Sequence, residues 1–138
     1  MSNEREFYIQ QNVPNSTQFE MKNFNINHRR VEHVDVLDLK GELDAHTASK
    51  LEDSLKNLIE KNNHNIIVNC RDLDYIASAG LGVFMAYIED VRGLGGDIKL
   101  TNMNERVYNV FDLLGFPTLY DIIEDENEAL ERFSNADN

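Results

Sequence analysis

The sequence predicts a single α/β domain with a mixed, mostly parallel sheet of about five strands, covered by about four helices. Its 138 residues are the length of one ordinary domain, which can bury a core without disulfides. Short apolar runs alternate along the chain with segments of helical period, an order typical of parallel crossovers. The β-branched run Ile66–Val68, bounded by asparagines, is typical of a strand buried on both faces and indicates parallel neighbours.

The predicted domain covers residues 21–134. Residues 1–20 have no sustained period and include Pro14 in a polar stretch, so we expect a loose N-terminal extension rather than a secretory signal. Residues 135–138 are expected to be a disordered C-terminal end. The last 18 residues carry seven acids and one base, half of the net charge, which is typical of a solvated helical face.

Alternating apolar residues predict two strands at the start of the domain. The residues that alternate are Phe24 and Ile26, then Val34, Val36 and Leu39. The polar stretch Asn27–Arg30 is the expected hairpin turn, and Gly41 is the expected end of the second strand. Apolar residues with helical spacing from Thr47 to Lys61 predict an amphipathic helix that follows these strands.

The second half continues the alternation of strands and helices. After the strand at Ile66–Val68, a helical period begins near Leu81 and stops at Gly93. The remaining expected elements are a strand at Ile98–Leu100, a helix at Val107–Leu114, a strand at Leu119–Ile123 and a last helix carrying Ala129, Leu130 and Phe133. We expect Phe111, Leu114 and Phe116 to lie in the core, and Cys70 to be packed at a strand end.

The charge and cysteine content limit the classes of partner. With 13 basic and 25 acidic residues, the formal net charge of −12 repels phosphate backbones and anionic membranes. No apolar stretch reaches the roughly 20 residues that cross a bilayer. The single cysteine, Cys70, cannot form an internal disulfide, which fits a reducing cytoplasm. We therefore expect a cytoplasmic protein with no direct nucleic-acid or membrane partner.

Catalytic and cofactor motifs are missing from the sequence. Ser78 lies at an expected strand-to-helix turn, but a hydrolase elbow needs glycine where Ile76 stands, and all four histidines precede the serine. The glycine pair Gly80 and Gly82 lacks the third glycine of a dinucleotide loop, because that position is Met85. The histidines and Cys70 have no metal-ligand spacing. We expect no enzyme activity, no cofactor and no metal.

Taken alone, Ser78 has two interpretations. It could cap the helix that begins near Ala79 by accepting a backbone N–H, a role worth about 1 kcal/mol. The same place at a helix N-terminus would also tolerate a phosphoryl group. The small neighbours Ala77, Ala79 and Gly80 leave the backbone open to another protein.

Two segments resemble the anti-sigma factor antagonists of the STAS-domain family. They are Gly41–Glu42–Leu43–Asp44, followed by Ala45–His46–Thr47–Ala48, and Tyr75–Ile76–Ala77–Ser78–Ala79–Gly80–Leu81–Gly82–Val83. Supporting matches lie at Gly95–Gly96 and from Val107 to Phe116, so the resemblance spans roughly residues 21–134.

The resemblance implies a non-enzymatic partner-switching protein. In the family, the serine aligned with Ser78 is phosphorylated by an anti-sigma factor that is also a serine kinase, and a phosphatase reverses the modification. The unphosphorylated form binds the anti-sigma factor and frees the sigma factor. The expected partner-binding residues are Asp44, Thr47, Ala77, Ser78, Ala79, Gly80 and Leu81. His46, beside Asp44, is expected to be a polar residue at a helix start.

The chain departs from the family pattern on both sides of the serine. The family usually has Asp before it and Ser or Thr after it, whereas this chain has Ala77 and Ala79. Ser78 is therefore the only hydroxyl of the loop, and the loop lacks the usual acidic neighbour. A non-catalytic STAS scaffold, or a module that senses a small molecule in another partner-switching system, stays open as an alternative.

Overall fold

A five-stranded mixed sheet forms the centre of the domain in a computed structural model, which describes residues 24–136. Its strands are β1 (Phe24–Val31), β2 (Val34–Leu43), β3 (Asn65–Ile76), β4 (Asp97–Thr101) and β5 (Ile122–Ile123). They lie side by side in chain order. β1 pairs antiparallel with β2, and the other three pairings are parallel. The predicted mixed, mostly parallel sheet of five strands is confirmed.

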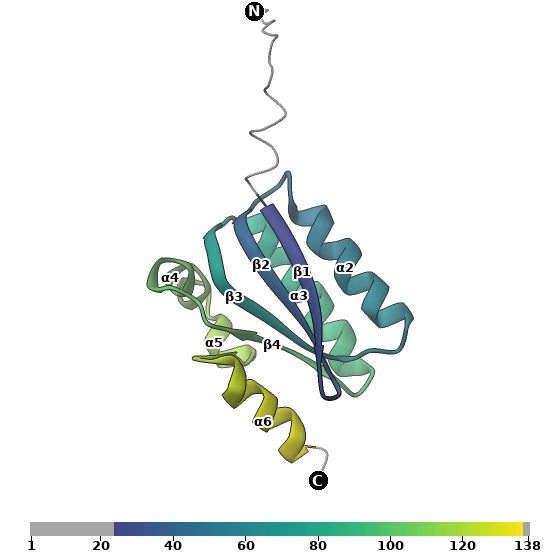
Figure 1. Ribbon diagram of the computed structural model, residues 1–138. Helices are drawn as coiled ribbons and strands as arrows, with labels where there is room; N and C mark the ends of the chain where they lie inside the picture. The colour runs from purple at the N-terminus through teal and green to yellow at the C-terminus, as the bar shows by residue number, and fades with distance from the viewer. Residues whose placement is uncertain (1–23, 137–138) are drawn as a thin grey trace, which may run out of the picture.

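Helices cover both faces of this sheet (Figure 1). The helices are α2 (Ala48–Glu60), α3 (Ser78–Gly93), α4 (Glu105–Leu113), α5 (Phe116–Leu119) and α6 (Glu126–Ala136). α2, α3, α4 and α5 pack on one face over the larger core, whereas α6 packs on the opposite face over a smaller apolar cluster. Within residues 24–136, no helix combines the length and the apolar composition that a membrane crossing needs.

The two cores follow from the alternation of side chains along the strands. On the larger side, Phe84 of α3 contacts Phe111, and the aromatic contacts continue through Phe116 to Tyr120. On the smaller side, Val36 and Ile67 of the sheet pack against Phe133 of α6. Central parallel strands are buried on both faces, which explains the continuous apolar run that predicted β3.

The predicted hairpin turn at Asn27–Arg30 is wrong. These four residues belong to β1, and the turn is Glu32–His33, where Glu32 has a φ of 58°. His28 and Arg30 point to one face of the sheet, where both pair with Asp35, and Asn27 and Arg29 point to the other face. Arg29 and Asn27 both donate hydrogen bonds to Asp38 of β2 from this face. The polar run therefore belongs to a strand whose side chains pair with carboxylates of β2, and not to a turn.

Three strand boundaries also differ from the prediction. β2 continues past Gly41, which has a φ of 103° beside a register shift, and ends at Leu43. β3 continues past Cys70 to Ile76, because its polar second half pairs with the end of β2. The strand predicted at Leu119–Ile123 is only Ile122–Ile123.

The C-terminal third contains one helix more than expected. Gly115 has a φ of 79°, which ends α4, and the short helix α5 with Pro117 in its first turn follows. Phe111 and Phe116 lie in the core as predicted, but Leu114 caps the end of α4 and is 58% exposed. α6 reaches Ala136, so residues 135 and 136 are helical rather than disordered. The expected N-terminal extension lies outside the described residues.

Candidate functional site

Ser78 is the first residue of α3 and is exposed to solvent. The capping position is Ala77, whose backbone is extended with a φ of −111° and a ψ of 171°. No side chain caps this helix, so the interpretation of Ser78 as the helix cap is wrong. Because Ser78 follows the capping position, its hydroxyl stands on the outside of the first turn. The hydroxyl makes no hydrogen bond to a side chain or loop within residues 24–136.

The start of α3 favours negative charge near Ser78. An α-helix leaves its first N–H groups without partners inside the helix, and its N-terminus carries a partial positive charge. In α3 these groups have neither a side-chain cap nor an acidic residue in the first turn. A phosphoryl group on Ser78 would therefore meet a favourable local field within this domain.

The loop after β2 is held together by Asp44 and Thr47. The Asp44 carboxylate accepts hydrogen bonds from the backbone N–H of His46 (2.9 Å) and of Thr47 (3.2 Å). In return, the backbone N–H of Asp44 donates to the Thr47 hydroxyl at 2.9 Å, and that hydroxyl donates to the carbonyl of Glu42 at 2.9 Å. These reciprocal bonds fix the chain just before α2 begins at Ala48.

The Asp44 loop and the Ser78 loop lie at the same end of the sheet. β2 and β3 run parallel, with Leu43 opposite Ile76, so the segments that follow them leave from neighbouring positions. The backbone N–H of Ala77 donates to the carbonyl of Leu43 at 2.9 Å and joins the two loops directly.

Gly80 permits the close approach of α3 to the end of β2. A Cβ atom at Gly80 would lie 2.7 Å from Cγ of Leu43 and 3.2 Å from Cγ1 of Ile76. Gly82, two residues further along, has nothing within 4 Å of the corresponding position. The first glycine is therefore needed for packing, and the second faces open space.

The seven expected partner-binding residues divide by burial. Ser78 is exposed, and Asp44, Ala77 and Ala79 are half-buried. Thr47, Gly80 and Leu81 are buried, so they lie beneath the surface that the other four residues form. The structure adds Tyr75 and Met85, each 48% exposed, which sequence reasoning missed.

Neither a metal centre nor a reactive thiol is found in the described part of the chain. No group of three or more potential ligands among residues 24–136 could hold a metal ion. Cys70 is fully buried, as expected, and burial raises the pKa of its thiol to about 12. At that pKa the thiolate form is negligible at neutral pH.

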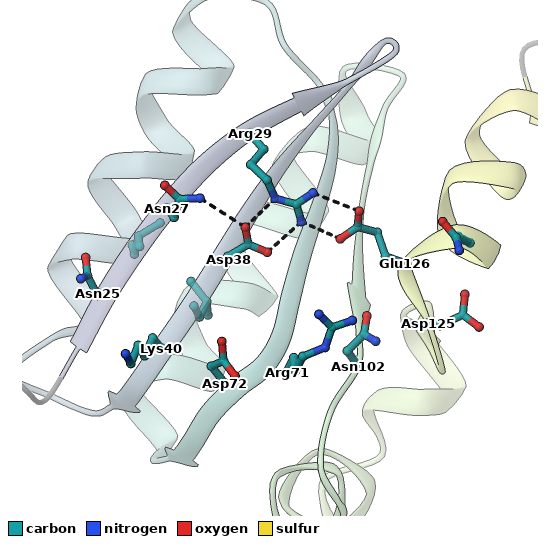
Figure 2. Close-up of a pocket in the computed structure, with 13 residues that line it drawn as sticks. Asn25, Asn27, Arg29, Asp38, Lys40, Arg71, Asp72, Asn102, Asp125 and Glu126 are labelled. Carbon is teal, nitrogen blue, oxygen red and sulfur yellow. Dashed lines mark hydrogen bonds and ion pairs between the residues drawn. The ribbon is translucent and has the colours of Figure 1, made fainter.

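A second polar region lies on the opposite face of the sheet (Figure 2). Arg29 of β1 donates to Asp38 at 2.6 and 2.8 Å, and to Glu126 of α6 at 2.7 and 3.2 Å. Asn69 donates to the same Glu126 carboxylate at 2.9 Å. Hydrogen bonds from Arg29 hold the pKa values of both carboxyl groups below their usual ranges. Because Arg29 and Glu126 are 97 residues apart, no local sequence pattern could have joined them.

Known proteins match this chain over most of its length. The model of the STAS domain matches residues 25–129. The anti-sigma-B factor antagonist of Bacillus subtilis is 32% identical over 100 residues, which cover 72% of this chain and 91% of that protein. The anti-sigma-B factor antagonist of Listeria monocytogenes is 30% identical over 110 residues, covering 80% of this chain and 93% of that protein.

Solved structures share the fold at lower sequence identity. A crystal structure of an anti-sigma factor antagonist from Mycobacterium paratuberculosis has a TM-score of 0.74 at 17% identity and covers 80% of this chain and 94% of that chain. The phosphorylated form of the Bacillus cell fate determinant SpoIIAA has a TM-score of 0.64 at 23% identity, covering 79% and 99% of the two chains. Together with the matches in sequence, this fold means that the chain belongs to the STAS-domain family and, within it, to the anti-sigma factor antagonists.

Proposed function

We propose that the unphosphorylated chain binds an anti-sigma factor with serine kinase activity and frees the sigma factor, and that phosphorylation of Ser78 prevents this binding. A phosphatase would restore the binding form. The observation that carries the proposal is the exposed Ser78 hydroxyl at the start of α3, joined to the Asp44 loop through Ala77 and Leu43. The relatives named anti-sigma-B factor antagonists and the phosphorylated form of SpoIIAA support it.

The proposed action is binding rather than catalysis, and its proposed place is the cytoplasm. The relatives are regulators by name, and the described residues contain no group of side chains that could hold a metal ion to activate a nucleophile. A net charge of −12 disfavours direct contact with nucleic acid or an anionic membrane.

Electrostatics explains how phosphorylation of Ser78 could weaken binding to the partner without unfolding the domain. A phosphoserine carries about −1.5 to −2 charges at neutral pH. Within the domain this charge lies at the N-terminus of α3, which stabilises it, so the modified protein stays folded. In a complex the same group must lose its water against the partner, and a mispaired charge at an interface commonly costs several kcal/mol. A cost of about 3 kcal/mol lowers the affinity roughly a hundredfold.

Apolar groups beside Ser78 supply contact area for a partner. Tyr75 precedes the loop and Met85 follows Ser78 by seven residues, which places Met85 on the same side of α3. Both side chains are about half exposed, and aromatic residues and methionine are enriched in interfaces. Ala77 and Ala79 leave the backbone of the loop accessible between them.

Asp44 is an acidic group in the loop joined to the Ser78 loop, where Ala77 replaces the acidic residue usual in the family. One of its carboxylate oxygens holds the loop before α2, and the structure gives the other oxygen no partner within residues 24–136. We propose that this second oxygen contacts the anti-sigma factor.

The test compares three proteins that differ only at position 78. The anti-sigma factor kinase is first recovered from native extract with the unmodified chain and produced in pure form. Calorimetric titration then measures its affinity for the parent, Ser78→Ala and Ser78→Asp. We expect Ser78→Ala to bind as tightly as the parent and Ser78→Asp to bind roughly a hundredfold more weakly. Incubation with ATP should add one phosphate to the parent and none to Ser78→Ala, as measured by mass spectrometry.

Ser134→Asp is the matched control. Ser134 is an exposed serine on α6, on the other face of the sheet, so this variant adds the same charge away from α3. It should bind like the parent. Equal affinities for Ser78→Ala and Ser78→Asp, or a phosphate on the Ser78→Ala protein, would refute the switch.

A further inference from the structure

An apolar groove lies between α4 and the edge strand β5 and shares no residue with the Ser78 surface. It has a volume of about 420 Å³. Four of its lining residues are apolar, namely Met103, Tyr108, Ile122 and Ile123, and the other two are Glu105 and Glu124. Tyr108 is 37% exposed, and Met103 and Ile122 are only half-buried against the larger core. Apolar groups that stay open to water inside a polar rim mark places where another molecule binds.

One side of the β5 backbone faces no other strand, because β5 is the last strand of the sheet. The Asp121 carbonyl accepts a hydrogen bond from the N–H of Leu100 in β4 at 3.0 Å. The Ile123 carbonyl accepts one from the N–H of Asn102 at 3.3 Å, also on the β4 side. Backbone groups of successive residues in a strand point to opposite sides, so the N–H and C=O groups of Ile122 point to the open edge. In the described part of the chain these two groups have no backbone partner.

The open edge and the groove are next to each other. Ile122 belongs to both, and its side chain packs toward the larger core, on the same side of the sheet as α4. Ile123 packs toward the cluster beneath α6, on the opposite face. Side chains alternate between the two faces of a strand. A chain added beside β5 would therefore place every second side chain over the groove.

Two carboxylates determine which side chains fit this place. Glu105 stands in the first turn of α4, and Glu124 directly follows β5. Both are exposed, and neither forms an ion pair within residues 24–136. The chain as a whole carries a net charge of −12. The groove therefore favours a positively charged partner.

We propose that an extended, basic segment of a partner protein binds here and adds a further strand to the sheet. Its backbone would pair with the N–H and C=O groups of Ile122. The residue opposite Ile122 would be apolar and would contact Met103 and Tyr108. Lys or Arg two residues before or after it would lie over the same face, beside Glu124 or Glu105. A helix or a small molecule would fit less well, since neither offers the alternating backbone groups that pair with a sheet edge.

The test uses four blocked heptapeptides, each titrated into the full-length protein while amide resonances are followed by NMR. The first has Leu at its centre, Lys two residues away on either side, and Thr elsewhere. The second has the same composition, but Lys stands directly beside Leu on both sides, which turns both charges to the opposite face. The other two copy the first and carry one N-methyl group, either on Leu or on the Thr that follows it.

We expect the first peptide to shift the amide resonances of Ile122 and Tyr108, with a dissociation constant on the order of 1 mM. The second should bind at least tenfold more weakly. An N-methyl group blocks pairing only where the N–H faces β5, which is at Leu for an antiparallel added strand and at the following Thr for a parallel one. One N-methyl peptide should therefore bind like the first, and the other at least tenfold more weakly.

Two variants change the groove and leave the backbone of β5 intact. Tyr108→Ala removes the exposed aromatic wall and should weaken binding of the first peptide at least threefold. Glu124→Gln removes one carboxylate and should weaken binding about threefold, the amount expected of an exposed ion pair. Glu60→Gln is the matched control, because Glu60 is exposed on α2, outside the groove, and the change in net charge is the same. It should bind the peptide like the parent.

Three results would overturn the proposal. Equal binding of the first and second peptides would mean that the acidic domain attracts any cation. Equal binding of the two N-methyl peptides would exclude pairing with the backbone of β5. No shift of the Ile122 resonance at about 10 mM peptide would mean that the shortness of β5 and the charge of Glu124 protect this edge from pairing. Ser78→Ala should bind the first peptide unchanged, so failure here leaves the proposed switch untouched.

Discussion

The polar groups of the Arg29 cluster are hydrogen-bonded to one another, whereas the polar group at the Ser78 end of the sheet is exposed and unbonded within residues 24–136. In the cluster, Arg29 donates hydrogen bonds to Asp38 and Glu126, and these bonds connect α6 to the β1–β2 hairpin. Ser78 stands exposed at an uncapped helix start, and only the backbone of its neighbour Ala77 is fixed to β2. A polar group already engaged within the domain stabilises the fold, whereas an exposed hydroxyl can be modified without unfolding it. We therefore expect changes at the first region to alter stability, and changes at the second to alter binding.

The largest stability effect is expected at the packing point beneath Ser78. Gly80→Ala places a methyl group 2.7 Å from Leu43, and overpacking of this kind costs about 1–3 kcal/mol. Gly82→Ala is the matched control, since nothing lies within 4 Å of it, and replacing a helical glycine should stabilise the protein by about 0.5–1 kcal/mol. Urea denaturation measures both. Equal effects at the two glycines would mean that α3 does not need its close approach to Leu43.

The next largest effect on stability is expected at the Arg29 cluster. Arg29→Gln leaves two partly buried carboxylates without their cation, and we expect a loss of about 1–2 kcal/mol, between the values of exposed and buried ion pairs. Arg132→Gln is the control, because its pair with Glu128 on α6 is about half exposed and should contribute less. Affinity for the anti-sigma factor should be unchanged in both variants. A weaker complex with Arg29→Gln would show that the two regions are coupled.

Substitutions of Asp44 separate support of the loop from contact with the partner. Asp44→Ala removes the acceptor that holds His46 and Thr47, and should cost about 1 kcal/mol of stability. Asp44→Asn keeps an oxygen acceptor and removes only the charge. We expect Asp44→Asn to keep most of the stability and still bind the anti-sigma factor more weakly, as measured by calorimetry. Unchanged affinity for Asp44→Asn would make this residue purely structural.

The smallest effect concerns the dependence of stability on pH. Arg29 lowers the folded-state pKa values of Asp38 and Glu126 below the ordinary values of 3.8 and 4.5. A lowered carboxyl pKa gives stability that is present above the ordinary pKa and is lost as the pH falls through the folded-state value. The parent should therefore lose more stability than Arg29→Gln when the pH falls below about 4.5. Identical pH profiles in urea denaturation would contradict this contribution.

Local patterns predicted the elements whose packing is periodic. The apolar face that predicted a helix from Thr47 to Lys61 is found in α2, Ala48–Glu60, and the run Ile66–Val68 lies within β3. Such elements are predictable because burial of one face repeats at the spacing of the backbone. The stretch Asn27–Arg30 was misplaced because four consecutive polar residues show no alternation with apolar ones. In the sheet they pair with two carboxylates of β2, Asp38 on one face and Asp35 on the other, which only the strand pairing shows.

By itself, the sequence determined the α/β alternation, the family motifs around Asp44 and Ser78, and the negative charge, since each depends on neighbours in the chain. Only the tertiary structure decided that Ser78 is exposed rather than a helix cap, and that Thr47, Gly80 and Leu81 lie beneath the surface. It also decided that Arg29 reaches Glu126. These properties depend on how distant strands and helices pack together, and no local spacing of residues encodes that packing.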